Sequence, residues 1–379
     1  MMPQQFREGD GAMRIVYVIT SLGMGGAERQ VLALADRMVA RGHRVILLVL
    51  RPRLSEEWPT TIEVVHLNMR KTPASFLRAL LRGRGVLAEF DPDLVHSHSF
   101  HANLVARLWK IVRLQTVVVS TVHNVYEGGW LRMLAYRLTD GLSRKTTAVS
   151  QAAADRFVRL KAVPLRKCVV TRNAIDLSEF APDAVRRSEI REKMAEGGAF
   201  IWLAVGRVVP AKDFPNLLLA FQQVRSVFPR AQLWIAGELS DKSTISSEDK
   251  RADGVHWLGL RRDMAALYDG ADAFVLSSAW EGMPLAAAEA MAMEKPVVAT
   301  DVGGVRELLG DAGVLVPAKD SETLGAAMAA MMKRSQEDRS VLGRAARERI
   351  VARFGMDARA DEWEGFYRAV LGSSLVNRT

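Results

Sequence analysis

The sequence predicts two doubly wound α/β domains, each with a parallel sheet covered by helices. Three observations predict this class. The chain has 379 residues, which is enough for two domains of ordinary size. Short apolar runs rich in β-branched residues alternate with stretches of helical spacing in both halves. The composition, with 49% apolar and 25% charged residues, excludes a disordered chain or a collagen-like repeat.

The first half begins with a buried strand. Residues 14–20 (RIVYVIT) form an apolar run, and residues 27–41 then place apolar side chains at helical spacing until Gly42 ends the helix. Helical stretches separate the later runs, as the crossover connections of a parallel sheet require. The further strands of this half are expected at residues 45–50, 62–67, 94–98 and 117–122.

The second half repeats the alternation. Its strands are expected at residues 201–205, 232–236, 255–258, 273–276, 296–299 and 314–316. Polar residues and a proline cluster at 175–195, which indicates the boundary between the domains. Two doubly wound domains would leave a cleft between the carboxyl ends of their strands, where ligands bind.

Cysteine content and hydropathy exclude several classes of protein. Cys168 is the single cysteine, which excludes an internal disulfide and a cysteine-based zinc or iron–sulfur site. No apolar run is long enough to span a bilayer. Residues 1–12 lack the apolar centre of a secretory signal and are expected to be a flexible tail. A reducing, cytoplasmic location fits these features.

The charge is concentrated in the first half. Residues 1–180 contain 26 Lys and Arg against 15 Asp and Glu, whereas residues 181–379 contain 26 against 28. A basic half favours an anionic partner, such as nucleic acid, an anionic membrane surface or a phosphorylated substrate. A solvated basic surface is the alternative. Residues 70–90 could form a basic amphipathic helix on anionic lipid, or an ordinary helix packed on the sheet.

Two loops have the composition of phosphate-binding turns. Gly25 and Gly26 lie in the segment Gly23–Glu28 between the first strand and its helix, where backbone N–H groups can approach an anion. The segment is not a complete dinucleotide fingerprint, and a tight turn is the alternative. Arg207 and Lys212 follow the strand at 201–205, and two cations at a strand's carboxyl end suit a pyrophosphate.

The segment Glu281–Glu289 (EGMPLAAAE) is the most informative. Glu281 ends a loop after a strand, Pro284 suits a first helical turn, and Glu289 lies within an apolar helix. A carboxylate there is costly unless it is paired or binds a ligand. The backbone of Gly282, Met283, Pro284 and Leu285 could offer N–H groups to phosphate or sugar oxygens.

The histidines allow several interpretations. His96 and His98 alternate on one strand, and a metal site there is the less favoured interpretation because no further ligand is evident. His123, followed by Asn124, sits at the end of an apolar strand and is suited to substrate contact or proton transfer. A structural histidine is the alternative. The pair Asp91 and Asp93 precedes its strand, which favours a turn over a metal–nucleotide motif.

The order and spacing of these motifs resemble glycosyltransferase family 4, the retaining enzymes of GT-B architecture. The resemblance covers nearly the whole chain, and the pair of glutamates with an upstream Arg/Lys pair is its most specific part. Within that family, the chain is similar to bacterial enzymes of capsule, exopolysaccharide or lipopolysaccharide O-antigen assembly. The motifs that carry the resemblance are residues 23–28, 93–98, 121–124, 147–150, 172–176, 206–213, 235–238, 258–260, 281–289 and 301–304.

The resemblance implies a role for each matching residue. Arg207 and Lys212 would hold the donor diphosphate, Glu281 would bind sugar hydroxyls and Glu289 ribose hydroxyls, with the backbone of 282–285 beside them. Residues Gly25 and Gly26 would approach the diphosphate, and Arg262 would lie near the base. His123, Glu281, Arg207 and Lys212 are the expected catalytic residues; His98, His123 and Asn124 are the expected acceptor-side residues.

The resemblance also implies organisation and partners. Residues 13–180 would be the acceptor-side domain, 181–355 the nucleotide-sugar domain, and 356–379 a helix crossing back to the first domain. The donor would be a nucleoside-diphosphate sugar, with a UDP-sugar as the first guess, and the acceptor a lipid-diphosphate-linked glycan. We expect no metal or other cofactor and no nucleic acid. We expect a cytoplasmic protein, peripheral on the inner face of the membrane.

Three other classes are alternatives. A nucleotide-sugar epimerase of similar two-domain fold would convert a donor without an acceptor. An NAD-dependent enzyme would need the complete glycine fingerprint, which is absent here. A non-catalytic, membrane-associated nucleotide-binding protein would bind lipid without turnover.

Overall fold

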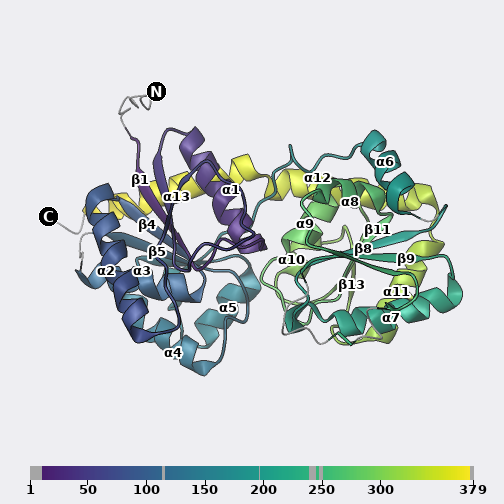
Figure 1. Ribbon diagram of the computed structural model, residues 1–379, viewed down its shortest axis with the longest axis horizontal. Coiled ribbons are helices and arrows are strands. Elements are labelled where there is room, and N and C mark those ends of the chain that lie inside the picture. The colour runs from purple at the N-terminus through teal and green to yellow at the C-terminus, as the bar shows by residue number, and fades with distance from the viewer. Residues whose placement is uncertain (1–10, 113–115, 196, 239–244, 247–250, 376–379) are drawn as a thin grey trace. The chain divides into compact units, whose positions relative to one another are not determined.

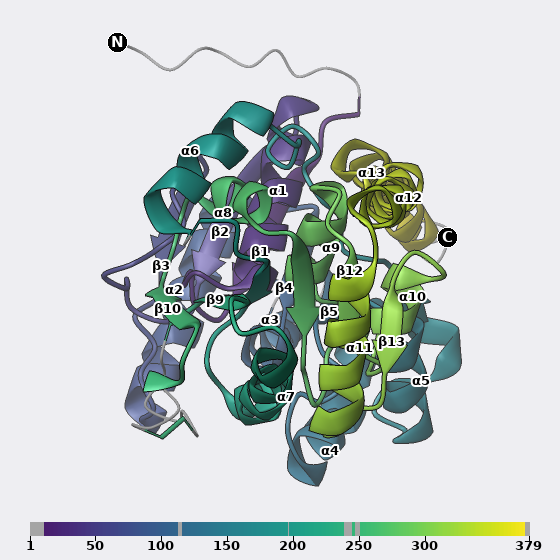
Figure 2. The ribbon, with the colours of Figure 1, turned by 90° about the vertical axis from the view of Figure 1, so that its right-hand side faces the viewer.

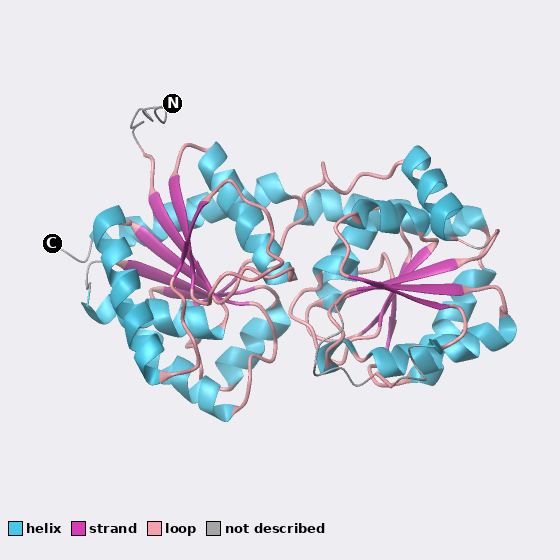
Figure 3. Cartoon of the chain, viewed as in Figure 1, coloured by secondary structure: helices cyan, strands magenta, loops and turns pink. Residues whose placement is uncertain are grey.

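The chain forms two compact α/β units (Figures 1 and 3). The computed structural model describes residues 11–112, 116–195, 197–238, 245–246 and 251–375. One unit contains Met1–Asn173 and Met356–Thr379, and the other contains Ala174–Gly355. Residues 174–180, expected in the first domain, therefore lie in the second unit. Within that unit the N–H of Ile175 donates to Phe354 O (2.7 Å). Most of the expected tail, residues 1–12, lies outside the described residues.

The first unit contains a seven-stranded parallel sheet in the order β3-β2-β1-β4-β5-β6-β7. The order reverses between β1 and β4, which is where doubly wound sheets bind ligands at the carboxyl ends of their strands. The strands are β1 (Arg14–Ile19), β2 (Arg44–Val49), β3 (Glu63–His66), β4 (Leu94–His98), β5 (Val117–Val122), β6 (Lys145–Ala148) and β7 (Cys168–Val170). The last two were not expected from the sequence, because β6 (KTTA) has little apolar content and β7 has three residues.

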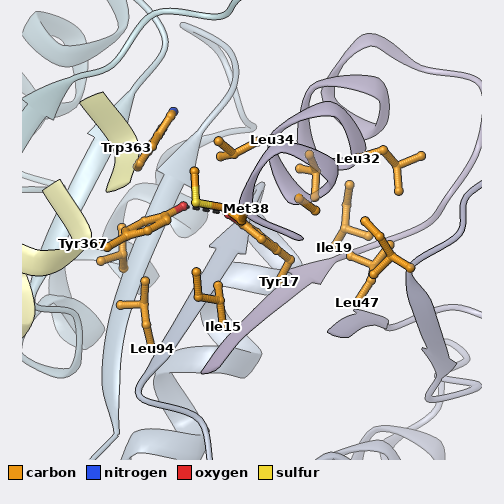
Figure 4. Close-up of a cluster of buried hydrophobic side chains, with 14 of the residues drawn as sticks. Ile15, Tyr17, Ile19, Leu32, Leu34, Met38, Leu47, Leu94, Trp363 and Tyr367 are labelled. Carbon is orange, nitrogen blue, oxygen red and sulfur yellow. Dashed lines mark hydrogen bonds between the residues drawn. The ribbon is translucent and has the colours of Figure 1, made fainter. Parts of the chain in front are cut away.

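Helices cover both faces of this sheet (Figure 1). They are α1 (Gly26–Ala40), α2 (Pro73–Phe90), α3 (Phe100–Val112), α4 (Trp130–Thr139), α5 (Gln151–Arg159) and α13 (Met356–Leu375). The long last helix, α13, packs on α1 and on the sheet (Figure 4). Trp363 and Tyr367 of α13 share one apolar core with Ile15 and Tyr17 of β1 and with Met38 of α1.

The second unit contains a six-stranded parallel sheet in the order β10-β9-β8-β11-β12-β13. The strands are β8 (Ile201–Val205), β9 (Gln232–Ala236), β10 (Val255–Gly259), β11 (Ala273–Leu276), β12 (Val297–Thr300) and β13 (Val314–Val316). All six were expected from the sequence, with ends that differ by at most one residue. The order reverses between β8 and β11, so this sheet has its own switch point.

The helices of the second unit cover its sheet in the same way. They are α6 (Ala184–Met194), α7 (Phe214–Val227), α8 (Met264–Gly270), α9 (Leu285–Ala292), α10 (Val305–Leu309), α11 (Ser321–Lys333) and α12 (Gln336–Phe354). Pro284, expected in the first turn of a helix, is instead the residue directly before α9. Among the described residues, no helix has the length and apolar character needed to cross a membrane.

Candidate functional site

The first cluster of polar side chains lies at the switch point of the second sheet, and we call it the Lys212 cluster (Lys212, Ser278 and Glu281). Lys212 ends a short 3-10 helix, Pro210–Lys212, that follows β8. Its Nζ lies 2.6 Å from Glu281 Oε1. Ser278 Oγ donates to the same oxygen at 2.7 Å. Glu281 is 7% exposed, so both contacts balance a carboxylate that is almost removed from water.

The loops that carry this cluster are bonded to one another. The N–H of Ala279 donates to Ala211 O (2.9 Å), and Ser277 Oγ donates to Lys212 O (2.8 Å). Thr300 Oγ1, at the end of β12, donates to Ser278 O (2.7 Å). The loops that follow β8, β11 and β12 are therefore joined by hydrogen bonds, which fix the position of Lys212 relative to Glu281.

Two glycines allow the backbone to approach Glu281 closely. The N–H of Gly304 donates to Gly282 O (2.9 Å). Gly303 has φ +54°, and a Cβ at that position would lie 1.8 Å from Glu281 O. Only glycine fits there, since a methyl group would overlap the carbonyl and the left-handed backbone disfavours other residues. The backbone of residues 301–304 thus packs directly against the backbone of the Glu281 loop.

Glu289 is bonded within the unit rather than exposed as a surface charge. It lies on α9, is 6% exposed, and its Oε2 accepts a hydrogen bond from the Tyr268 hydroxyl at 2.8 Å. The same hydroxyl lies 2.9 Å from Ala286 O. Burial of a carboxylate within an apolar helix is therefore compensated by Tyr268. Neither Tyr268 nor Ser278 was identified from the sequence, because a lone Tyr or Ser carries no pattern.

The other expected donor-side residues differ in exposure. Gly282, Met283, Pro284 and Leu285 are buried, whereas Arg207 and Arg262 are exposed. Arg207 follows Gly206, which packs so closely on Gly237 that a Cβ on Gly237 would lie 2.0 Å from Gly206 O. The chain thus places Arg207 at the carboxyl end of β8, near Lys212 in sequence but open to water.

The second cluster lies at the carboxyl ends of β4 and β5, beside the switch point of the first sheet, and we call it the His123 cluster (His98, His123, Glu127 and Tyr136). His98 ends β4 and His123 follows β5, and His98 Nδ1 lies 3.0 Å from His123 Nε2. Burial lowers the pKa of His123 to about 4 and lowers that of His98 well below its usual range. Both rings are therefore neutral near pH 7, and one donates its proton to the other. His98 Nε2 is buried with no hydrogen-bond partner among the described residues.

Glu127 anchors the loop that carries His123. Its Oε1 accepts from the backbone N–H of His123 (2.9 Å), and its Oε2 accepts from the Tyr136 hydroxyl (2.6 Å). Burial raises the pKa of Glu127 to about 7, although these hydrogen bonds and the charges of Arg132 and Arg107 favour the ionised form. The sequence analysis missed Glu127; its position in a glycine-containing loop after a strand was the available signal.

The remaining acceptor-side expectation, Asn124, has a local role. Its Oδ1 accepts from the backbone N–H of Tyr126 (3.2 Å), which shapes the turn after His123. A cavity of about 20 Å³ lies beside the two histidines. Arg172, Arg359 and Trp363 are among the residues that line it. It has room for about one water molecule.

His96 joins the last helix to the sheet. Its Nε2 lies 2.6 Å from Thr121 Oγ1, and its Nδ1 lies 2.7 Å from the hydroxyl of Tyr367 on α13. That hydroxyl lies 3.1 Å from the hydroxyl of Tyr17 (Figure 4). A structural role accounts for His96. No group of three or more residues suited to hold a metal ion occurs among those that the structure describes.

Two other predicted motifs have clear local structures. Gly25 is the residue before α1; its N–H donates to Gly23 O (2.8 Å), and a Cβ on it would lie 2.4 Å from Oε2 of Glu28. Asp91 and Asp93 lie 3.0 and 3.4 Å from the Arg14 guanidinium. Asp91 directly follows α2 with φ +48°, and Asp93 directly precedes β4, so both aspartates lie in the short connection that the sequence favoured.

Comparison with protein families decides the class of the chain. A model described as "Glycosyltransferase Family 4" matches residues 24–179, and one described as "Glycosyl transferases group 1" matches residues 199–334. Together they cover most of both units. The chain belongs to glycosyltransferase family 4.

The relatives of this family 4 glycosyltransferase use different donors. It is 26% identical over 319 residues to UDP-Gal:alpha-D-GlcNAc-diphosphoundecaprenol alpha-1,3-galactosyltransferase of Escherichia coli, with 77% of this chain and 79% of the relative covered. It is 28% identical over 390 residues to GDP-mannose-dependent alpha-mannosyltransferase of Mycolicibacterium smegmatis, with 95% and 98% covered.

Solved structures confirm the fold of the glycosyltransferase. Anabaena Alr3699/HepE in complex with UDP has a TM-score of 0.80 at 19% identity, with 94% of this chain and all of that chain covered. Sucrose-phosphate synthase from Thermosynechococcus elongatus has a TM-score of 0.81 at 20% identity, with 95% and all covered. The expectation of two Rossmann-like units of GT-B type is confirmed.

Proposed function

We propose that this glycosyltransferase transfers a sugar, with retention of configuration, from a UDP-sugar to a lipid-diphosphate-linked glycan in bacterial surface polysaccharide synthesis. The Lys212 cluster is the observation that carries the proposal, because it presents a cation and a carboxylate together at a sheet switch point. The E. coli relative, whose name contains a UDP-sugar and a diphosphoundecaprenol acceptor, supports this choice of donor and acceptor. The alternatives of an epimerase, an NAD-dependent enzyme or a non-catalytic protein gain no support from the relatives.

Each residue of the donor side has a proposed role. Lys212 and Arg207 bind the donor diphosphate, Lys212 as a point charge and Arg207 as a two-pronged donor. Arg207 is exposed, so it can turn toward a phosphate without breaking a buried contact. Glu281 accepts hydrogen bonds from the sugar hydroxyls, and its bond to Lys212 sets its orientation before the donor arrives. Glu289 accepts hydrogen bonds from the ribose hydroxyls beside Tyr268.

The proposed chemistry occurs on one face of the sugar. The bond from the anomeric carbon to the diphosphate oxygen breaks, and the acceptor oxygen forms the new bond from the same side. The acceptor proton passes to the leaving diphosphate, so charges and atoms balance. Lys212 and Arg207 stabilise the charge that builds on the leaving group, and on this basis we propose that no metal is required. His123, neutral at pH 7, contacts the transferred sugar as a hydrogen-bond partner.

The proposal places the protein on the inner face of the cytoplasmic membrane. Its first half is basic, with 26 Lys and Arg against 15 acidic residues up to residue 180. Anionic lipid attracts such a surface, and a lipid-linked acceptor would be found there.

Nucleotide release tests the proposal. Purified enzyme is incubated with UDP-galactose, UDP-glucose or GDP-mannose and a GlcNAc-diphosphate lipid in detergent. We expect acceptor-dependent release of UDP, unaffected by EDTA, that falls at least about a hundredfold in Lys212→Ala. Lys333→Ala, at the exposed end of α11, is the matched control and should retain full activity. A folded Lys212→Ala enzyme with normal turnover would overturn the proposed donor site.

A further inference from the structure

The outer face of α4 is apolar although it is exposed to water. Trp130, Leu131, Leu134 and Leu138 are 72%, 64%, 39% and 75% exposed, and we call these four residues the α4 ridge. Positions 130, 134 and 138 are one helical turn apart and therefore share one face. Monomeric proteins rarely leave large apolar side chains grouped in this way unless the surface binds something.

The orientation of α4 is fixed by its inner face. Met133 and Tyr136 are buried. The Tyr136 hydroxyl bonds to Glu127 (2.6 Å), and the Tyr136 carbonyl accepts from Arg107 (3.1 Å). Rotating the helix to bury the ridge would break these contacts and leave Arg107, which is fully buried, without that partner. The exposure of the ridge is therefore a stable property of the unit.

The ridge lies in a strongly basic part of the chain. Residues 126–167 contain nine Lys and Arg and three acidic residues, a formal net charge of +6. Arg137 is exposed on α4 itself, and Arg159 is exposed on α5. The two helices are neighbours, since the rings of Tyr136 on α4 and Phe157 on α5 lie 5.4 Å apart. Figures 1 and 2 show α4 at the lower edge of its unit.

We propose that the α4 ridge inserts into the interface of an anionic lipid bilayer. The leucines of the ridge would be buried at the boundary between headgroups and acyl chains, and Trp130 would lie at headgroup level. The surrounding arginines would bind the anionic headgroups. A second copy of the chain fits less well, because pairing two ridges would bring two basic segments together. The role of the ridge in bringing the enzyme to its acceptor rests on the proposed function. Trp130 follows His123 by seven residues, so an inserted ridge holds the His123 loop near the headgroup layer, where a lipid-linked diphosphate lies.

Helix α2 provides a control surface for the membrane-binding test of α4. Its Leu77 and Leu81 are each 57% exposed, and the exposed Arg78, Arg82 and Arg84 accompany them. For this segment the sequence allowed either a membrane-surface helix or an ordinary helix packed on the sheet. It presents two exposed leucines and no exposed aromatic residue, whereas α4 presents three leucines and a tryptophan. A double substitution by serine on each helix therefore compares how much the two surfaces contribute to vesicle binding.

Sedimentation with vesicles tests the proposal. The full chain is mixed with vesicles of phosphatidylcholine and phosphatidylglycerol, or of phosphatidylcholine alone. We expect binding to the anionic vesicles, and a loss of about tenfold or more in partition for Trp130→Ser with Leu138→Ser. Leu77→Ser with Leu81→Ser should change it less than about twofold. Thermal unfolding confirms that both variants are folded.

Two further readouts separate the outcomes. Tryptophan emission should shift to the blue with anionic vesicles in the wild type, and the shift should shrink in Trp130→Phe, which still binds. Equal partition of wild type and the α4 variant, or a greater loss in the α2 variant, would overturn the proposal. So would a dimer that the α4 variant abolishes without any vesicle binding. UDP release with detergent-dispersed acceptor is measured alongside: if turnover is absent but the vesicle result holds, the proposed function fails and the ridge stands.

Discussion

Substitution of Gly303 by alanine tests how the structure positions Glu281. The new Cβ would lie 1.8 Å from Glu281 O, whereas ordinary contact begins at 3.4 Å, so the two backbones must separate by about 1.6 Å. The φ of +54° adds about 1 kcal/mol for a non-glycine residue. Overpacking adds about 1–3 kcal/mol. We expect Gly303→Ala to lower the free energy of unfolding by about 2–4 kcal/mol.

The effect on activity should be larger than the loss of stability suggests. The Glu281 loop is held by Ser278, Ala279 and Lys212, so the strain displaces the carboxylate rather than a free end. A misplacement of about 1 Å near reacting groups costs roughly a hundredfold in rate. We expect kcat/KM for UDP release to fall by about that factor at a temperature where the variant is fully folded.

The matched control is Gly42→Ala in the other unit. Gly42 has φ +84° and no atom within 4 Å of an added Cβ, so this variant acquires backbone strain without overlap. It should lose about 1 kcal/mol of stability and keep wild-type activity. Equal kcat/KM in the folded Gly303→Ala variant and in wild type would refute the idea that this contact positions Glu281.

Three further predictions concern single side chains. Burial raises the pKa of Glu127 from 4.5 to about 7. From about pH 4.5 to 7 the folded chain therefore holds a proton that the unfolded chain has lost, and the free energy of unfolding falls as the pH rises. Glu127→Gln should remove this contribution. Thermal midpoints across that range should therefore rise more with pH in the variant, and parallel curves would contradict the assignment. Tyr367→Phe removes the hydroxyl that pairs with His96 Nδ1, and this loss should cost about 1–3 kcal/mol in urea unfolding. An unchanged midpoint would show that the bond contributes little. Glu281→Gln should keep the thermal shift produced by UDP, because it spares the proposed diphosphate contact, yet lose sugar transfer; loss of the UDP shift would contradict this division of roles.

The strands were predictable where the sequence carries a continuous apolar run. All six strands of the second sheet and the first five of the first sheet were predicted, and most of them contain such a run. In β4 (LVHSH) the apolar part is only Leu94 and Val95. The missed strand β6 contains Lys145 and two threonines, and it is recognisable only because β5 and β7 pair with it. Burial by neighbours, rather than its own residues, makes it a strand.

The candidate site was predictable in its residues but not in its pairings. The sequence indicated Lys212 and Glu281 separately, 69 residues apart, and the structure joins them in one contact. Glu127 was missed because its one signal in the sequence, a place in a glycine-containing loop after a strand, does not show which groups it contacts. Its importance follows from the His123 N–H and the Tyr136 hydroxyl, which reach it only once the chain is folded.

The sequence by itself determined two parallel α/β units, the strand ends that carry the polar residues, and the family, because apolar periodicity and motif order are local properties of the chain. Tertiary structure decided which polar groups face each other and which apolar groups remain outside. The helix α4 illustrates the reason. Its sequence is apolar on two sides, and the tertiary contacts of its inner face, among them those of Tyr136 with Arg107 and Glu127, determine that Trp130 and Leu138 face the solvent.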